Sequence, residues 1–528
     1  MVRPVHLLYP PRVPVALRAA ATVVLLRDTP QGLQALLARR GPDARYAPGA
    51  CVFPGGGVDA VDDSADAHAI TQQRPGQGVL RLTQAITAIR ECFETLGVLL
   101  AYDANGQPVG PQELAQLDRA ACRSSASAFI QQCSAMGLML AADRLHLLAH
   151  WISDRDLPKR FDVPLLVARM PEGQRAVGDE EGRCEPLWVH PAEAMARHDA
   201  GTLHLLFSTY RTLQWLARHG DVDSVLRTCR GEAPQWMSCP RAGLLGSQPT
   251  RYMEHEPAYG ELALVCPDGQ ITHELAWQHE RPVALLKNLR RLTAPNPGPA
   301  TGPGTNSYIV GTEASGAIVI DPGPADAGHV QRLVAATGGD VRAIVCTHSA
   351  PERAGAAWLL QAICQQRSRL SIPVLGRPSP PQAGPTASFT PDRELQHGER
   401  LSLMGFGISH TLRAIHTPGH AANHLCLLFE EEGLLFSGGY AASGTADPAP
   451  PSGGDTARYL RALDRLQEAC EQASVGTLLP SHGHARAPAA EALHGLRRQR
   501  LQHESEKLHA ASKPRPLSGS TGAGLRPA

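Results

Sequence analysis

Residues 90–98 read Arg90-Glu-Cys-Phe-Glu-Thr-Leu-Gly-Val98, and the glycine-rich turn Phe53-Pro-Gly-Gly-Gly57 precedes them. At about 100° per residue, Glu91 and Glu94 fall on one face of a helix, opposite an apolar stripe. The stripe consists of Ile86, Ile89, Phe93 and Leu96. Gly97 stands where the helix needs a left-handed end. The spacing therefore predicts an amphipathic helix that carries two carboxylates one turn apart.

Two carboxylates one turn apart on a rigid helix are hard oxygen ligands at a spacing that Mg²⁺ or Mn²⁺ accepts, especially when substrate phosphates complete the coordination shell. An Arg-Glu-x-x-Glu pattern by itself is also typical of a solvated helix face. The glycine-rich turn upstream favours the metal site.

From about residue 18 to 220, the chain resembles a Nudix hydrolase, a family that cleaves nucleoside diphosphates linked to another group. In that family a glycine loop is followed by Arg-Glu-x-x-Glu-Glu-x-Gly on a helix. The matching residues are Arg90, Glu91, Glu94 and Gly97. Thr95 replaces the last glutamate of the pattern. The resemblance implies an α/β/α sandwich and a site for Mg²⁺ or Mn²⁺.

A long insertion, Val58 to Thr83, separates the glycines from the helix. It resembles a branch of the same family that includes coenzyme A diphosphatases of the peroxisome. Other residues that match this branch are Leu36-Leu37, Arg40, Arg45, Pro48 to Gly56, His150-Trp151, Arg160 to Asp162, Trp188, Pro191, Glu193 and Ala194. The resemblance implies a small phosphorylated substrate, either coenzyme A, one of its acyl esters or a nucleoside diphosphate derivative.

The resemblance also implies a role for each site residue. Glu91 and Glu94 are the expected metal ligands, and Arg90 is expected to orient them; these three form the predicted catalytic set. The turn made by Gly55, Gly56 and Gly57 is expected to bring the backbone close to the metal and the phosphates. The insertion leaves no glutamate at the usual upstream position.

The base that activates water is not assigned by this helix. Candidates are Glu180, Glu181 and Glu185, which lie between two strand-like runs at residues 164–170 and 186–190. A polar hairpin tip explains the same three residues equally well.

The second half of the chain, about residues 296–484, carries a different set of landmarks. They are Gly304 to Tyr308, Val319 to Gly323, Thr347-His348, His416 to His420, Leu435 to Gly438 and Leu479 to Gly483. With these, the segment resembles a metallo-β-lactamase-fold hydrolase of the glyoxalase II type. The resemblance implies an αββα sandwich, in which two facing sheets are flanked by helices.

The metal motif of that family, His-x-His-x-Asp-His, reads His348-Ser-Ala-Pro-Glu-Arg353 in this chain. The bridging carboxylate expected after Gly438 is replaced by Gly439. Only His348, His420 and His482 remain at ligand positions. A guanidinium about 4 Å from a divalent ion opposes it by roughly 8 kcal/mol at an effective dielectric of about 20.

We therefore do not expect Zn²⁺ in this half. The residual site comprises His348, Glu352, Arg353, His420 and His482. Three interpretations stay open for it: a single zinc if the rings converge, a set of hydrogen-bonded polar residues, or an anion held by Arg353 where metals are bound in the family.

The predicted organisation has four parts. Residues 1–225 form the Nudix-like domain, and residues 226–295 form a connecting segment. Within that segment, the alternating runs Gly260 to Val265 and Gln270 to Leu275 predict a β-hairpin. Residues 296–500 form the metallo-β-lactamase-like domain, and residues 505–528 form a disordered tail. The fold class is α/β followed by α+β.

The chain of 528 residues has a formal net charge of zero and no basic block, so nothing indicates binding to nucleic acid or to an anionic membrane. No apolar run approaches the ~18 residues of a membrane span, and prolines interrupt the N-terminus where a secretory signal would lie. We therefore expect a cytoplasmic protein. Arginine carries most of the positive charge, which favours a GC-rich bacterial origin. The oligomeric state stays open.

Three functions remain open. The first is a Mg²⁺- or Mn²⁺-dependent Nudix diphosphatase, with the second domain as a scaffold or ligand-binding module. The second is a zinc-dependent hydrolase of thioester-type substrates in the C-terminal half. The third is a binding or regulatory protein with both sites inactive. The N-terminal site retains the larger share of its family's ligands, so the first function is the prediction.

Overall fold

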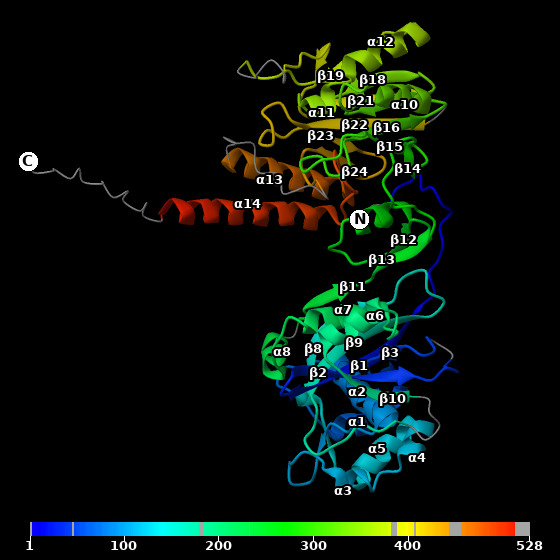
Figure 1. The fold of residues 1–528 in the computed structure, drawn as a ribbon, viewed down its shortest axis with the longest axis vertical. Helices are drawn as coiled ribbons and strands as arrows, with labels where there is room; N and C mark the ends of the chain where they lie inside the picture. The colour runs from blue at the N-terminus through cyan, green and yellow to red at the C-terminus, as the bar shows by residue number, and fades with distance from the viewer. Residues whose placement is uncertain are drawn as a thin grey trace, which may run out of the picture. The chain divides into compact units, whose positions relative to one another are not determined.

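The computed structural model describes residues 3–44, 47–178, 184–231, 233–381, 388–405, 408–442 and 456–512. The chain divides into two compact units (Figure 1). The N-terminal unit is Val13–Arg241, and the C-terminal unit combines Met1–Arg12 with Ala242–Ala528. Among the described residues, no helix combines the length and the apolar character that crossing a membrane requires.

The N-terminal unit is built on a mixed eight-stranded sheet. Its main strand order is β10-β2-β1-β9-β8-β11, with β3 paired to β2 and β4 paired to β1. The bounds are β1 Leu17–Thr29, β2 Gly32–Arg40, β3 Cys51–Val52, β4 Gly55–Gly57, β8 His146–Ile152, β9 Arg160–Arg169, β10 Cys184–Val189 and β11 Trp236–Ser238. The long strands β1 and β9 pair in parallel at the centre of the sheet.

Helices cover the central strands on both faces. Successive side chains of a strand point to opposite faces, and Val23, Val24, Leu25 and Leu26 of β1 are all fully buried. Val23 and Leu25 pack in one core with α2 (Val79–Leu96), and α8 (Val222–Thr228) also contacts β1 and β9. This is the α/β/α arrangement predicted from the sequence.

Further elements complete this unit. They are η1 Ala60–Asp63, α1 Ala65–Ala69, β5 Thr71–Gln72, β6 Ala101–Tyr102, α3 Pro111–Leu114, α4 Arg119–Ser124, α5 Ala126–Ala135, β7 Met139–Ala141, η2 Ala142–Arg144, α6 Pro191–Asp199 and α7 Phe207–Leu216. The insertion Val58 to Thr83 is therefore folded, since it contains η1, α1 and β5. These elements lie directly before α2 in the chain.

Helix α2 confirms the helix predicted around the two glutamates. Ile86, Ile89, Phe93 and Leu96 are buried in the core, as the apolar stripe requires. The helix ends at Gly97, whose φ of 67° is left-handed. A residue without a side chain adopts this conformation at little cost. The chain turns there toward the buried run that follows.

The C-terminal unit contains two larger sheets. The seven-stranded sheet has the order β14-β15-β16-β17-β18-β19-β20, and the five-stranded sheet has the order β21-β22-β23-β24-β25. The bounds are β14 Val283–Leu286, β15 Leu289–Thr293, β16 Asn306–Thr312, β17 Gly316–Ile320, β18 Val341–Val345, β19 Val374–Gly376, β20 Arg393–Glu394, β21 Arg400–Gly405, β22 Ile408–His416, β23 Leu425–Phe429, β24 Leu434–Gly438 and β25 Thr477–Pro480.

The two sheets face each other, and helices cover their outer faces. Val310 of β16 and Leu427 of β23 lie in one shared core. Neighbouring residues of the same strands point outward: Ile309 packs with α10 (Ala327–Thr337) and α12 (Ala357–Ser368). On the other sheet, Leu428 packs with α13 (Thr456–Gln472) and α14 (Ala489–Ser512), the orange and red helices of Figure 1. The αββα sandwich predicted from the sequence is confirmed.

Two predictions about local structure were wrong. The run Gly260 to Val265 forms part of helix α9 (Tyr259–Val265) and not a hairpin strand. Leu262, Leu264 and Val265 are all buried, whereas a two-faced strand would expose alternate residues. A two-stranded sheet does occur nearby, between β12 (Arg241–Leu245) and β13 (Gln248–Tyr252). Helix α14 extends to Ser512, so residues 505–512 are helical and not disordered; residues 513–528 lie outside the described residues.

The first residues of the chain pack within the C-terminal unit, although residues 1–225 were predicted to form one domain. Leu7 is 8% exposed and belongs to the core between the two sheets. The buried carboxylate of Glu432 accepts a hydrogen bond from the backbone nitrogen of Val5 at 2.8 Å and contacts the ring of His6. Arg3 pairs with Asp268. The N-terminal unit is thus inserted between two segments of the C-terminal unit.

Candidate functional site

Arg90, Glu91 and Glu94 of α2 come together, with Arg90 buried beside the two partly exposed glutamates. The Arg90 side chain is almost fully buried. Its Nη1 donates to Oε1 of Glu91 at 3.1 Å and to both carboxylate oxygens of Glu94 at 3.2 Å. One guanidinium nitrogen therefore holds the two carboxylates side by side.

The other side of Arg90 is held by Asp62, a residue that the sequence analysis missed. Arg90 Nε and Nη2 donate to the two carboxylate oxygens of Asp62, each at 2.9 Å. Asp62 is fully buried and also accepts from Thr87 Oγ1 at 2.8 Å. Arg90 Nη2 further donates to the carbonyl oxygen of Gly57 at 3.0 Å.

A bidentate pair between a guanidinium and a carboxylate is geometrically specific. It leaves Arg90 little freedom. Asp62 lies in the insertion, which has no glutamate at the position where the family usually carries one. The sequence feature that could have identified Asp62 is the spacing Asp59-x-x-Asp62, which forms a capping box at the start of η1.

The glycine turn lies against the glutamates. Strand β4 pairs with β1, and a Cβ added to Gly56 would lie 2.2 Å from the carboxyl carbon of Glu91. A Cβ on Gly55 would lie 2.4 Å from the carbonyl oxygen of Ala21, whereas one on Gly57 would meet nothing within 4 Å. Gly55 is thus required for strand packing, and Gly56 leaves the space that the Glu91 carboxylate uses.

Burial dominates the electrostatics of the pair. It raises the pKa of Glu91 despite the opposing charge of Arg90. Burial also raises the pKa of Glu94 to about 7; Arg90 lowers it, and the neighbouring Glu91 charge raises it further. Burial alone would lower the pKa of Arg90, but the hydrogen bonds and charge of Asp62 outweigh it and raise that pKa. Two crowded carboxylates that share one guanidinium nitrogen favour an additional cation.

This donor set fits Mg²⁺ or Mn²⁺. Such ions are usually held by one or two protein carboxylates, with waters and substrate phosphates in the remaining positions. The Glu91 and Glu94 side chains keep 19% and 13% of their surface exposed, so they are reachable from solvent. Within the described part of the chain, no group of three or more His, Cys, Asp or Glu side chains is placed to hold a metal ion by itself. Waters or ligand oxygens would complete the shell of an ion held by these two carboxylates.

Arg119 holds the C-terminal end of α2 and was also missed by the sequence analysis. Its Nε donates to the Glu94 carbonyl oxygen at 3.1 Å, and its Nη2 donates to the Thr95 carbonyl oxygen at 2.5 Å. Its Nη1 donates to the carbonyl oxygens of Val177 and Gly178. A cation at a helix C-terminus interacts favourably with the free carbonyls there.

Of the three candidates for the catalytic base, the structure describes only Glu185. Glu180 and Glu181 lie outside the described residues. Glu185 lies in β10 with 71% of its side chain exposed, and its ion-pair partner is Arg39 at 3.6 Å. This contact points away from the pair on α2. The surroundings of Glu185 are those of a surface residue on the sheet.

The C-terminal unit brings together the histidines that the sequence singled out. The ring centroids of His348 and His420 lie 5.1 Å apart. His424, which the sequence analysis missed, lies 5.2 Å from His348 and 5.4 Å from His420. Its Nε2 accepts from the backbone nitrogen of Gly439 at 2.9 Å. The sequence feature that could have identified His424 is the repeated His-x-x-x-His spacing of residues 416, 420 and 424.

Arg353 lies among these rings. Its Nη1 donates to His348 Nε2 at 2.5 Å, and its Nη2 donates to His482 Nε2 at 2.9 Å. Burial and then the Arg353 charge lower the pKa of His348 well below its usual value. The same causes lower the pKa of His420 to about 3 and that of His482 to about 4. Glu352 keeps 34% of its side chain exposed, 3.5 Å from Arg353.

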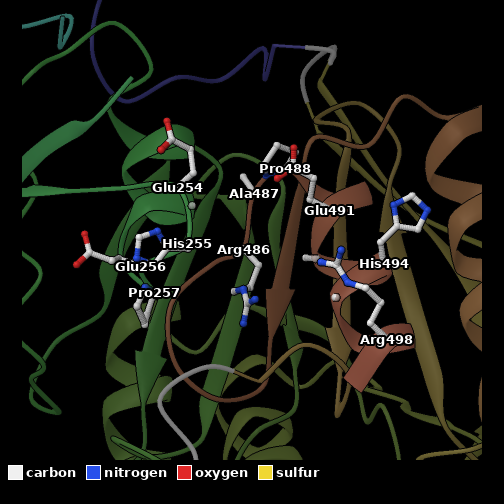
Figure 2. Close-up of a pocket in the computed structure, with 13 residues that line it drawn as sticks. Glu254, His255, Glu256, Pro257, Arg486, Ala487, Pro488, Glu491, His494 and Arg498 are labelled. Carbon is white, nitrogen blue, oxygen red and sulfur yellow. The ribbon is translucent and has the colours of Figure 1, made fainter. Parts of the chain in front are cut away.

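The described part of the chain also contains cavities lined by other residues. The first has a volume of about 430 Å³ and lies in the C-terminal unit, between residues 254–260 and the start of α14 (Figure 2). Arg486 and Arg498 line it together with Glu254, Glu256 and Glu491. The second, also about 430 Å³, lies at the C-terminal end of α2, next to Arg119. Neither cavity is lined by a residue of the predicted sites.

Comparison with known proteins identifies the C-terminal fold. The model of the metallo-beta-lactamase superfamily matches residues 300–482. The Lactamase-like protein adaB of Aspergillus niger is 26% identical over 256 residues, which are 46% of this chain and 69% of adaB. The Lactamase-like protein aptB of Emericella nidulans is 31% identical over 160 residues, 29% of this chain and 45% of aptB. The C-terminal unit therefore has a metallo-β-lactamase fold, which implies divalent-metal binding in general.

A third relative carries a more specific name. The Atrochrysone carboxyl ACP thioesterase nsrC of Aspergillus novofumigatus is 32% identical over 165 residues, 30% of this chain and 44% of nsrC. The chain thus spans less than half the length of aptB and nsrC. These relatives are fungal, whereas the composition had favoured a bacterial origin.

Two solved structures are also similar to part of the chain. The NUDIX hydrolase from Alicyclobacillus acidocaldarius is 24% identical, with 42% of this chain and 99% of that protein covered and a TM-score of 0.37. A metallo-beta-lactamase family protein from Thermus thermophilus is 22% identical, with 45% of this chain and 85% of that protein covered and a TM-score of 0.34.

The residues of the C-terminal site do not fit the metal that its fold implies. Arg353 donates to Nε2 of both His348 and His482, the ring atoms that a metal would need. His424 Nε2 is engaged by the backbone. A Cβ on Gly439 would lie 2.1 Å from His420 Nε2, so the ring fills the space of a bridging side chain there.

Proposed function

We propose that the protein is a Mg²⁺- or Mn²⁺-dependent Nudix-type hydrolase that cleaves a diphosphate linkage at the site on α2. The observation that carries the proposal is the network around Arg90. A buried carboxylate, Asp62, fixes one edge of the guanidinium, and the other edge holds Glu91 and Glu94 side by side. A charged arginine so well satisfied is the arrangement expected of a residue that orients metal ligands.

In the proposed reaction, water loses a proton and attacks one phosphorus atom of the diphosphate linkage, the bond between that phosphorus and the bridging oxygen breaks, and the other phosphoryl group leaves with the bridging oxygen. A bound Mg²⁺ or Mn²⁺ would neutralise charge on the phosphoryl oxygens and hold the leaving group. Glu91 and Glu94 would hold the ion, and Arg90 keeps their carboxylates at a fixed separation. Gly56 keeps the space beside Glu91 open. We propose Glu180 or Glu181 as the base that activates the water.

The substrate class follows from the resemblance of the insertion and its flanking motifs. We propose coenzyme A, one of its acyl esters, or a nucleoside diphosphate derivative. The C-terminal unit would act as a scaffold or as a ligand-binding module. The insertion itself supports the same site, since its Asp62 is the residue that anchors Arg90.

The test is turnover of coenzyme A, acyl-coenzyme A and a panel of nucleoside diphosphate conjugates with Mg²⁺ or Mn²⁺. Metal-dependent turnover that is lost in Glu91→Gln and in Glu94→Gln would support the proposal. Glu172→Gln, an exposed glutamate of the same unit, is the matched control and should retain full activity. Turnover that survives both substitutions on α2 would refute it.

A second candidate is hydrolysis of a thioester by the C-terminal unit. The name of nsrC favours it, because that relative is an acyl carrier protein thioesterase. The Arg353 contacts argue against zinc chemistry at the same residues. Hydrolysis of acyl thioesters that requires added zinc and is abolished by His482→Gln would establish this second function. Absence of both activities would leave a binding or regulatory role.

A further inference from the structure

We infer that the guanidinium of Arg353 takes the place of a metal ion in the C-terminal unit: it joins His348 to His482 and thereby keeps divalent cations out of the site. His348 follows β18 of the seven-stranded sheet, and His482 follows β25 of the five-stranded sheet. Arg353 lies in the short helix α11 (Pro351–Ala354) and hydrogen-bonds to both rings. One cation therefore links loops from the two sheets, as a shared metal ion would.

The hydrogen bonds define which nitrogen atoms are in use. An arginine guanidinium can only donate, so Nε2 of His348 and Nε2 of His482 must each accept with a lone pair. The Nδ1 of His482 is then the protonated nitrogen, and it donates to the carbonyl oxygen of Gly304 at 3.1 Å. A metal ion binds imidazole through the same kind of lone pair. The two lone pairs are thus already occupied by Arg353.

The loops around the guanidinium are also held without a metal. Asp321 is 2% exposed, and its carboxylate accepts from the backbone nitrogen of Thr347 at 2.7 Å and from Ser481 Oγ at 2.9 Å. Thr347 and Ser481 directly precede the two histidines. Asp321 therefore fixes the same two loops that Arg353 joins. The site is a hydrogen-bonded network in which a positive charge is already present.

The limited space around Arg353 also argues against a metal ion at this site. Arg353 is 3% exposed, so its charge lies inside the site and cannot move aside into solvent. The ring of His420 fills the space beside Gly439. A divalent ion would have to displace the guanidinium before it could reach the rings. Removal of Arg353 is consequently the step that should open the site to zinc.

The experiment measures zinc bound to the full-length protein, by equilibrium dialysis against zinc followed by metal analysis. All variants carry Glu91→Gln and Glu94→Gln, which remove the ligands on α2. The parent should bind less than about 0.1 zinc per chain, and Arg353→His should bind about one, because three or four imidazoles suffice for a zinc site. Arg342→His is the matched control, since Arg342 is an exposed arginine of the same unit; it should bind no more zinc than the parent.

A second measurement guards against a variant that fails to fold. The unfolding temperature of the parent should be the same in zinc and in a chelator, whereas that of Arg353→His should rise in zinc. Arg353→Gln, which keeps a shorter amide donor, provides a second opened site. His482→Gln in the Arg353→His chain should abolish the zinc and so locate it. About one zinc per parent chain, removed by His482→Gln, would overturn the inference. Failure of both folded Arg353 variants to take up zinc would overturn it too.

Discussion

Substitution of Gly56 by alanine should damage the site on α2 without damaging the fold. The added Cβ would lie 2.2 Å from the Glu91 carboxyl carbon and 2.2 Å from its Oε2. Ordinary van der Waals contact begins near 3.4 Å, so the carboxylate must move by about 1 Å. Because the obstructed atoms are the end of a flexible side chain, the movement is possible without unfolding. A displacement of about 1 Å at a reacting centre costs roughly 100-fold in rate, or about 2.7 kcal/mol of activation free energy.

The neighbouring glycine provides the control. A Cβ on Gly57 meets nothing within 4 Å, and neither glycine has a left-handed φ. Gly57→Ala therefore has the same backbone effect as Gly56→Ala. An alanine restricts the unfolded chain more than a glycine does and so raises the free energy of unfolding by about 0.4–1 kcal/mol. Gly57→Ala should leave the Glu91 carboxylate in place. A difference between the two variants then reports the position of that carboxylate alone.

The assay is Mn²⁺ affinity by titration calorimetry, together with turnover of whichever diphosphate conjugate the wild type cleaves. Gly56→Ala should show weakened Mn²⁺ binding and roughly 100-fold slower turnover. Gly57→Ala should resemble the wild type in both, and both variants should unfold at or slightly above the wild-type urea midpoint. The reasoning would be refuted if Gly56→Ala folded normally and kept wild-type Mn²⁺ affinity and turnover.

Three other predictions concern stability. Asp62→Ala leaves the buried Arg90 charge without its main partner, and should lower the unfolding free energy of the N-terminal unit by about 3–5 kcal/mol in urea titrations; an unchanged midpoint would contradict the pairing. The Arg291 and His484 charges outweigh burial and hold the pKa of Glu261 well below 4.5. The ionised Glu261 therefore stabilises the fold above pH 4.5, and this stabilisation is lost as the pH falls toward its lowered pKa. The unfolding temperature should consequently decrease less between about pH 5 and pH 3 in Glu261→Gln than in the wild type. Deletion of residues 1–12 removes Leu7 from its core and a donor from the buried Glu432; calorimetry should show a lower midpoint for the C-terminal unit, and an unchanged one would show that the segment adds no stability.

Local patterns were enough to predict the helix that carries the candidate site. The apolar stripe, the two carboxylates and the terminal Gly97 all act within a few turns of chain, so their spacing reports the structure directly. The two facing sheets were likewise predicted, because their motifs recur in a known family. The hairpin at Gly260 was wrong. An alternating pattern of seven residues or fewer does not distinguish a strand from a helix when nearly every side chain becomes buried, as in α9.

The residue types at both sites can be read from the amino-acid sequence: two carboxylates and an arginine on one helix, and a histidine motif interrupted by Arg353. Their hydrogen-bond partners become known from the folded chain. Asp62 reaches Arg90 across 28 positions, and Arg353 reaches His482 across 129. The N-terminal segment completes a unit whose other residues begin at Ala242. Such contacts depend on how distant elements pack, and no short-range spacing encodes them, because a hydrogen bond or an ion pair forms wherever folding brings its atoms within about 3 Å.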